Sequence, residues 1–207
     1  MRGRFITLEG GEGVGKSTQA KRLAEALRAR GIDIIETREP GGSAGAEAIR
    51  KLLLEGAGDR WTAEAEALLF AAARADHVAR TIRPALDAGK WVVCDRFLDS
   101  SLAYQGGASG LGDDAIRALH DVGSGGLLPD RTLLLDLPMF TAATRELERD
   151  GGNRDRFGER DAPFHKAVVE SFRRLAAGEP DRFRVVDAKG SPEEVTARLL
   201  AALDDLL

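Results

Sequence analysis

The stretch Gly10-Gly11-Glu12-Gly13-Val14-Gly15-Lys16-Ser17-Thr18 decides how the rest of the chain is interpreted. It fits the pattern G-x-x-x-x-G-K-[ST], in which glycines precede a lysine and a hydroxyl residue. Residues 4–8, before the stretch, are mostly apolar and include the β-branched pair Ile6-Thr7, which predicts a strand. Residues 16–30, at its end, carry apolar side chains at helical spacing. A strand, a glycine loop and a helix in this order are the context that a phosphate-binding loop requires.

The chemistry of this loop follows from its residue types. Glycines let backbone N–H groups converge on phosphate oxygens, and the N-terminus of the following helix adds partial positive charge. Lys16 can reach the β- and γ-phosphates of a nucleotide, and the Ser17 hydroxyl can bind Mg²⁺. A glycine-rich turn that matches the pattern by chance is the alternative. The strand and the helix on the two flanks argue against it.

Composition bounds the class of protein. The chain has 207 residues, which predicts one domain, or one domain with a small mobile insertion. The net charge of −4 argues against a protein that grips nucleic acid by bulk charge. The single cysteine, Cys94, excludes an internal disulfide framework and lies in an apolar run typical of a core.

No apolar run approaches the ~18 residues that a membrane span needs. The first predicted strand starts within a few residues of Met1, which leaves no room for a signal peptide. We therefore expect a cytoplasmic protein that engages neither a membrane nor nucleic acid.

Strand-like and helix-like segments alternate along the chain. We expect further strands at 32–37, 91–95, 131–136 and 183–187. We expect helices at 43–55, 62–88 with a kink at Pro84, 139–150, 162–177 and from 191 onward, with helical pieces over 97–126. This order predicts an α/β fold with a mostly parallel sheet covered by helices.

Polar residues follow each predicted strand, where parallel sheets bind ligands. They are Glu9, Arg38-Glu39, Asp95-Arg96, Asp136 and Asp187. At the end of the third strand, Asp95 can hold Mg²⁺ or accept a hydrogen bond from Ser17, and Arg96 can clamp a phosphate. A simple ion pair at the strand end is the alternative reading of Asp95 and Arg96, and the glycine loop argues for phosphoryl transfer instead.

A segment of alternating charge covers residues 149–160. It contains Arg149, Arg154, Arg156 and Arg160 against Asp150, Asp155 and Glu159, among several glycines. The near balance of charge means that any arginine that acts does so individually. We interpret the segment as a small lid that closes over phosphates, with a solvated surface loop as the alternative.

Two further groups of residues suit a flat ring. Phe70 and Arg74 lie four apart on a predicted helix and so share a face, where Phe70 could stack on the ring and Arg74 donate to its oxygens. Taken alone, Phe70 also fits a core position. A second polar run holds Ser100, Ser101, Tyr104 and Gln105. The Gln105 amide can both donate and accept, which suits the edge of a base, although helix-surface polarity explains these residues equally well.

Five motifs, in this order, resemble those of bacterial thymidylate kinases. They are Leu8–Thr18, Arg38–Gly42, Leu69–Arg74, Asp95–Gly107 and Asp155–Phe157. The likeness continues to the loop at Asp187 and so covers essentially the whole chain. Apart from the glycine loop each motif alone is weak, but their order is highly specific.

The resemblance implies a P-loop NTPase-like fold with a parallel five-stranded sheet, a small mobile lid and one nucleoside monophosphate kinase domain over residues 1–207. It implies Mg²⁺-assisted, in-line transfer of the ATP γ-phosphoryl group to dTMP, giving dTDP for dTTP synthesis. It also implies a homodimer.

The resemblance further implies roles for single residues. The loop residues Gly10, Gly11, Glu12, Gly13, Val14, Gly15, Lys16, Ser17 and Thr18 would bind ATP, Ser17 with the metal, and Arg145 would lie against adenine. Arg38, Arg74 and Arg96 would hold dTMP, Arg96 through its 5′-phosphate. Phe70 would stack on thymine, with Ser101 and Gln105 on its edge. Glu12 would bind the 3′-hydroxyl, and Tyr104 would crowd the 2′ position and favour deoxyribose.

An arginine from the lid would reach the transferring phosphoryl group. Some members of the family carry this arginine in the glycine loop, but here none lies between Gly10 and Lys16. The chain therefore resembles the type with a catalytic lid. We assign the role to Arg156, with Arg154 and Arg160 left open.

Three other readings remain. A GTPase or ATPase switch would need an Asn-Lys-x-Asp run, which the only asparagine, Asn153, does not supply. A kinase of a different nucleoside monophosphate is a second reading, because the residues favour a pyrimidine but do not choose thymine over uracil. A module that binds ATP without chemistry is the third, and Asp95-Arg96 and the lid arginines argue against it.

Overall fold

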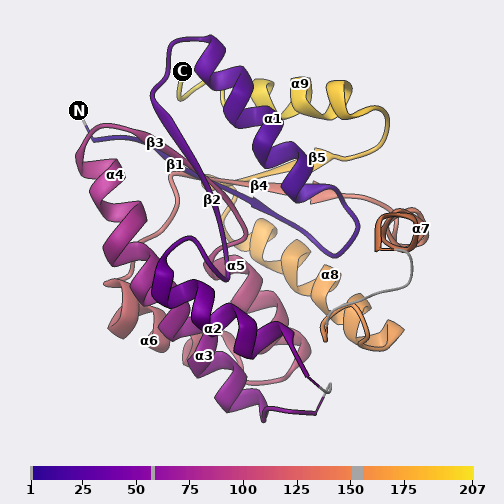
Figure 1. Ribbon diagram of the computed structural model, residues 1–207. Coiled ribbons are helices and arrows are strands. Elements are labelled where there is room, and N and C mark those ends of the chain that lie inside the picture. Colours follow the sequence, from indigo (N-terminus) through magenta and orange to yellow (C-terminus); the bar gives the residue numbers. More distant parts are fainter. Residues whose placement is uncertain (1, 57–58, 151–155) are drawn as a thin grey trace.

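The computed structural model describes residues 2–56, 59–150 and 156–207. In these residues, five strands form one parallel sheet in the order β2-β3-β1-β4-β5 (Figure 1). They are β1 (Phe5–Glu9), β2 (Ile34–Arg38), β3 (Trp91–Asp95), β4 (Arg131–Asp136) and β5 (Phe183–Asp187). This confirms the α/β fold. The strand order reverses around β1, which in such sheets places the ligand crevice at its carboxyl end.

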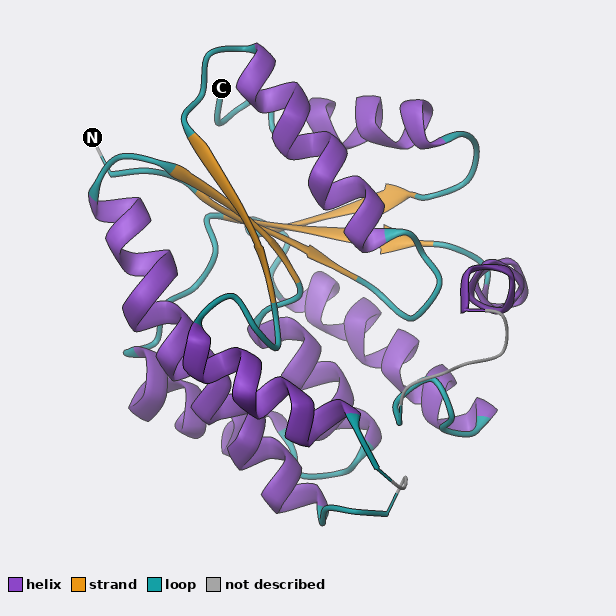
Figure 2. Cartoon of the chain, viewed as in Figure 1, coloured by secondary structure: helices purple, strands orange, loops and turns teal. Residues whose placement is uncertain are grey.

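Helices cover both faces of the sheet, with α1 and α9 on one face and α3, α6 and α8 on the other (Figures 1 and 2). The α-helices are α1 (Lys16–Ala29), α2 (Ala44–Leu54), α3 (Ala63–His77), α4 (Arg83–Asp87), α5 (Leu98–Ser101), α6 (Asp113–Ser124), α7 (Met139–Asp150), α8 (Ala162–Gly178) and α9 (Pro192–Ala201). Two π-helical turns, η1 (Val78–Ile82) and η2 (Leu102–Ala108), continue α3 and α5. Within the described chain, no helix is long and apolar enough to cross a bilayer.

Two boundaries differ from the sequence expectation. The second strand starts at Ile34 rather than at residue 32, because the Ile32 N–H still bonds to the Leu27 carbonyl at the end of α1. The long helix expected over 62–88 changes character at Val78, before Pro84, which instead occupies the first turn of α4. Proline suits that position because its missing N–H has no helical partner there.

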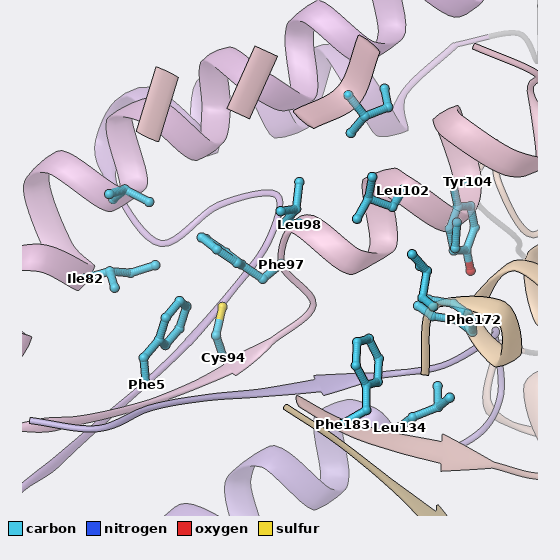
Figure 3. Packing of buried hydrophobic residues seen from close by; sticks show 14 of the residues in the cluster. Phe5, Ile82, Cys94, Phe97, Leu98, Leu102, Tyr104, Leu134, Phe172 and Phe183 are labelled. Atoms are coloured by element: carbon cyan, nitrogen blue, oxygen red, sulfur yellow. The ribbon is translucent and has the colours of Figure 1, made fainter. Parts of the chain in front are cut away.

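The three central strands, β3, β1 and β4, are buried on both faces, so two apolar cores flank the sheet. One packs under α1 and α9 and contains Ile6, Leu8 and Val93. The other lies against α3 to α6 and α8, and Figure 3 shows Phe5 and Phe97 within it, their rings edge to face at 4.8 Å. Cys94 is buried in this second core, as its apolar surroundings predict.

A buried polar network lies beneath the carboxyl end of β1. Glu9 is fully buried and accepts hydrogen bonds from the Phe97 N–H at 2.8 Å and the Ser100 hydroxyl at 2.6 Å. Asp99, also fully buried, accepts from both Nη atoms of Arg182 at 2.7 and 2.8 Å. Burial, and next the negative charge of Asp99, raise the pKa of Glu9 to about 8.

This pKa predicts a pH-dependent stability. As the pH rises from about 5 to about 8, the unfolded chain releases the Glu9 proton while the folded chain keeps it. The free energy of unfolding therefore falls, by at most about 1.4 kcal/mol per pH unit for this one proton. Glu9→Gln cannot titrate, so its stability relative to wild type should improve steadily across this range and level off above it. Urea unfolding at pH 5, 6.5 and 8 measures the effect. Glu25→Gln, at an exposed position of α1, is the control, and its free energy of unfolding should vary with pH as that of wild type does. If the free energy of Glu9→Gln also followed the wild-type pH dependence, the raised pKa of Glu9 would be contradicted.

Candidate active site

A cavity of about 750 Å³ opens where the carboxyl ends of β1, β2 and β3 meet. Most of the residues predicted from the sequence line it. They are Glu12, Gly13, Val14, Gly15, Lys16, Ser17, Thr18, Arg38, Phe70, Arg74, Asp95, Arg96, Ser101, Tyr104, Gln105 and Arg145. Gly10, Gly11 and Arg156 are not among the lining residues. Residues of the glycine loop and the expected ring-binding residues thus share one cavity, although Glu12 and Gln105 are 93 positions apart in the sequence (105 − 12).

The glycine loop follows β1 and leads into α1 at Lys16. The Lys16 Nζ donates to the Gly11 carbonyl at 2.6 Å, and its side chain is buried. Burial, together with the nearby charge of Arg96, lowers the pKa of Lys16 to about 8. Phosphate oxygens in the loop would favour the charged ammonium and take the place of the Gly11 carbonyl.

Two positions of the loop leave no room for a side chain. Gly10 has a φ of 139° and Gly13 a φ of 71°. A Cβ on Gly10 would lie 2.7 Å from the Leu135 carbonyl oxygen, and one on Gly13 would collide with the carbonyl of Ala142 in α7. Glycine is required here for its backbone conformation and for its size. The loop therefore runs directly against α7.

Ser17 and Asp95, which the sequence predicts as metal ligands, are in direct contact. The Ser17 hydroxyl donates to Asp95 Oδ2 at 2.5 Å. The other carboxylate oxygen, Asp95 Oδ1, is buried and has no hydrogen-bond partner among the described residues. A buried carboxylate oxygen without a donor is costly unless a cation or a water satisfies it. One carboxylate and one hydroxyl beside a phosphate loop suit Mg²⁺, which typically takes few protein ligands and several from phosphates and water.

Arg96 is held in a strained conformation. Its φ is 67°, and it is the only residue other than glycine with a positive φ in the described chain. Its Nη1 donates to the Gly10 carbonyl at 3.2 Å and to Ser100 Oγ at 3.0 Å. A left-handed backbone costs an arginine of the order of 1 kcal/mol or more, and such strain persists where the surroundings enforce it. Here the strain turns the guanidinium back toward the glycine loop.

Glu12 pairs with Arg96 inside the cavity. Its Oε1 accepts from Arg96 Nη2 at 2.6 Å and from the Tyr104 hydroxyl at 2.7 Å. Burial would raise the pKa of Glu12, but the charges of Arg96 and Lys16 outweigh it and lower the pKa to about 2. The Arg96 guanidinium also lies 5.1 Å from the centre of the Tyr104 ring. The glycine loop thus turns its acidic side chain toward the residues expected to hold the acceptor.

The far end of the cavity carries the residues expected to bind a ring. Arg74 is buried, and its Nε donates to Glu39 Oε2 at 2.8 Å and its Nη2 to Ser101 Oγ at 2.7 Å. Phe70 is half-buried and meets the Phe157 ring edge to face at 5.6 Å. Phe70 therefore packs against the core and also lines the cavity, where stacking on a ring stays a prediction.

Three arginines lie further from the centre. Arg38 is half exposed and pairs with Glu47 at 3.0 Å, while Arg145 in α7 donates to the Ala188 carbonyl at 3.3 Å. Arg156 is buried, with its Nη1 on the Leu53 carbonyl at 2.8 Å. Of the remaining lid arginines, Arg160 lies 3.6 Å from the carboxylate of Glu66, and Arg149 and Arg154 fall outside the described side chains.

Sequence reasoning missed one residue of the site. Glu66 in the first turn of α3 is buried, and its Oε1 accepts from the Gln105 amide at 3.0 Å. Its Oε2 lies 3.5 Å from Arg156 Nη2. A glutamate in an Ala- and Leu-rich helical run carries no signal of burial, because the same residue usually occupies the exposed face. Only the fold shows that this position faces inward.

Comparisons with known proteins agree with this geometry. The sequence model of the family described as thymidylate kinase matches residues 8–199. A curated thymidylate kinase from Rhizorhabdus wittichii is 74% identical over 207 residues and covers 100% of both chains. One from Chromohalobacter salexigens is 53% identical and covers 99% of this chain and 97% of its own. The crystal structure of thymidylate kinase from Ehrlichia chaffeensis superposes with a TM-score of 0.79 at 30% identity, covering 99% of this chain and 100% of that one. The chain belongs to the thymidylate kinase family.

Proposed function

We propose that the protein transfers the γ-phosphoryl group of ATP to the 5′-phosphate of dTMP, giving dTDP for dTTP synthesis. Family membership supports this function, and so does one observation in particular. A single cavity is lined both by Lys16 of the glycine loop and by Phe70 and Arg74, the pair expected to bind the ring. Arg96 also lines this cavity and donates a hydrogen bond to the Gly10 carbonyl of the loop. A nucleoside triphosphate and a nucleoside monophosphate can therefore meet with their phosphates at Arg96.

Transfer takes place by direct in-line attack. The acceptor is already a phosphate oxygen anion, so no strong general base is needed. Catalysis then consists of positioning and of neutralising charge. Lys16 would hold the β- and γ-phosphates, and Arg96 the 5′-phosphate of dTMP. Each such clamp contributes on the order of a few kcal/mol to lowering the barrier.

Ser17 and Asp95 would hold Mg²⁺ in this reaction. The free oxygen of Asp95 and the hydroxyl beside it fit that ion. When bound, Mg²⁺ supplies positive charge that screens the phosphates. Asp95 also holds the Ser17 hydroxyl at the start of α1, next to Lys16, which joins the proposed metal ligands to the glycine loop.

The acceptor nucleotide would lie between α3 and η2. Phe70 stacks on thymine, Arg74 and Ser101 meet its edge together with Gln105, and Arg38 assists in holding the nucleotide. Tyr104 would crowd the 2′ position and favour deoxyribose, and its burial beside Glu12 supports this role. Glu12 binds the 3′-hydroxyl from the same side.

Outside this centre the proposal has four parts. Arg145 lies against adenine, and its place in the lining of the same cavity supports this. Residues 149–160 act as the lid, and the whole chain forms one kinase domain. The enzyme is cytoplasmic. It forms a homodimer through α3, whose Leu68 side chain is 55% exposed.

A coupled assay with a panel of nucleoside monophosphates tests the function. We expect ATP-dependent turnover with dTMP and none with AMP or GMP. Lys16→Ala should nearly abolish turnover with dTMP, because the phosphate cradle loses its only ammonium group. Lys21→Ala removes an exposed lysine of the same helix and should match wild type. Near-normal activity of Lys16→Ala would contradict the cradle, and ATP hydrolysis without any acceptor would favour an NTPase switch.

Arg156 is the second test. We expect Arg156→Ala to lower kcat by about 10²-fold or more, as removal of a preorganised charge on a phosphoryl group does, while raising KM for dTMP much less. Steady-state kinetics give both parameters, and Arg30→Ala, an exposed arginine, is the control. A loss confined to KM would make Arg156 a binding contact. A fall in thermal stability with unchanged kinetics would limit its role to structural contacts such as those with Leu53 and Glu66.

A further inference from the structure

Glu66 lies behind the wall of the cavity. Its side chain is only 2% exposed and does not line the cavity. Glu66 lies in the first turn of α3, one turn before Phe70. A carboxylate buried in this way needs partners for both oxygens. The partners of Glu66 come from two different parts of the chain, η2 on one side and the segment after residue 155 on the other.

The two carboxylate oxygens of Glu66 contact different partners. Oε2 faces two guanidinium groups, with Arg156 Nη2 at 3.5 Å and Arg160 Nη2 at 3.6 Å. These charges compensate the buried carboxylate. Oε1 accepts a hydrogen bond from the side-chain amide of Gln105 at 3.0 Å. Unlike Glu66, Gln105 lines the cavity.

This contact fixes which way the amide of Gln105 points. A glutamine amide can rotate by half a turn, and its two ends then exchange donor and acceptor. A carboxylate only accepts hydrogen bonds, so it admits the NH₂ end of the amide and rejects the carbonyl end. Gln105 must therefore keep its Oε1 away from Glu66. No donor in the described residues bonds to this oxygen, which leaves it for a ligand.

Arg74 supplies the complementary group. Its Nε and Nη2 are engaged by Glu39, Ser101 and the Phe97 carbonyl, while its Nη1 makes no hydrogen bond within the described chain. The cavity wall thus offers one fixed acceptor and one fixed donor to a ring edge. Thymine and uracil present a carbonyl oxygen next to a ring N–H and match this pair. Cytosine presents an amino group next to a bare ring nitrogen and opposes it at both atoms.

We propose that Glu66 is a positioning residue that, by locking the amide of Gln105, makes the site select bases with a carbonyl and ring N–H edge over amino-pyrimidines. The inference rests on the proposed transfer to dTMP and deepens it. Without the lock, the amide can turn its NH₂ group toward the bare ring nitrogen of cytosine. A site whose polar groups are fixed rejects a mismatched base far more strongly than one that can adapt.

Glu66→Gln tests the lock, because glutamine can donate as well as accept. The measured quantity is the ratio of kcat/KM for dTMP to that for dCMP. We expect the ratio to fall by about 10-fold or more, since a fixed hydrogen-bonding pair typically sets discrimination well above that level. Glu64→Gln makes the same change at an exposed position of the same turn and should leave the ratio as in wild type.

A double-mutant cycle separates positioning from a general effect on folding. If Glu66 acts through Gln105, then Glu66→Gln should change the ratio no further in a Gln105→Ala background. If Glu66→Gln lowered the dTMP to dCMP ratio in the Gln105→Ala background by the same factor as in wild type, the proposal would be overturned. An unchanged ratio in folded Glu66→Gln would also overturn it, with thermal unfolding as the check on folding.

The exchange variant Glu66→Gln with Gln105→Glu keeps the charge and volume of the pair. This variant tests the proposal even if the single variant Glu66→Gln does not fold. Residue 105 would then carry the carboxylate, which presents an acceptor whichever way it turns, so the preference for dTMP over dCMP should persist. Loss of that preference in the exchange variant would overturn the proposal. Failure of the proposed function is a different result, namely a wild-type enzyme that does not phosphorylate dTMP at all.

Discussion

The register between β1 and β3 is the constraint on which the site depends. Leu8 lies opposite Asp95, and the Arg96 N–H bonds to the Leu8 carbonyl at 3.0 Å. The glycine loop therefore begins, after β1, beside the point where β3 ends at Asp95 and the chain continues to Arg96. A shift of the pairing by one residue would turn Asp95 to the other face of the sheet. Ser17 would then lose its partner, and Arg96 could no longer reach Gly10.

The apolar cores on both faces hold that register. Val92 and Cys94 of β3 enter one core, and Val93 enters the other. A slip of β3 by one residue would exchange these side chains between two close-packed cores and draw Asp95 toward one of them, so packing opposes it. Packing far from the cavity thus fixes the placement of its charges. The buried network of Glu9 and Asp99 adds hydrogen bonds at the point where the strand ends.

The cations of the cavity are already paired. Arg96 contacts Glu12, Arg74 contacts Glu39, and the Lys16 ammonium contacts a carbonyl. The carboxylate of Glu12 holds Arg96 in position, but its negative charge lies beside the place expected for a phosphate. Ligand phosphates must then compete with groups that the protein itself supplies. Preorganised charge of this kind needs little rearrangement at the moment of reaction.

The fold could be predicted from the sequence because its signals are local. Signals from neighbouring residues suffice for the glycine loop, the apolar strands and the start of the last helix at Ser191-Pro192. In the structure, Ser191 begins that helix with a capping box. Polar residues at strand ends indicated the site for the same reason. The contacts of Glu66 and the burial of Arg156 could not be predicted, because they join segments about 90 residues apart (156 − 66) and leave no periodic pattern.

The contact between the glycine loop and α7 restricts how this sequence can change. Any residue larger than glycine at position 13 would have to displace the backbone at Ala142 and also adopt a positive φ. An arginine cannot be introduced there by one substitution while α7 keeps its place. A side chain at position 13 therefore requires α7 to move first, so the sequence of the loop and the position of this helix cannot change independently there.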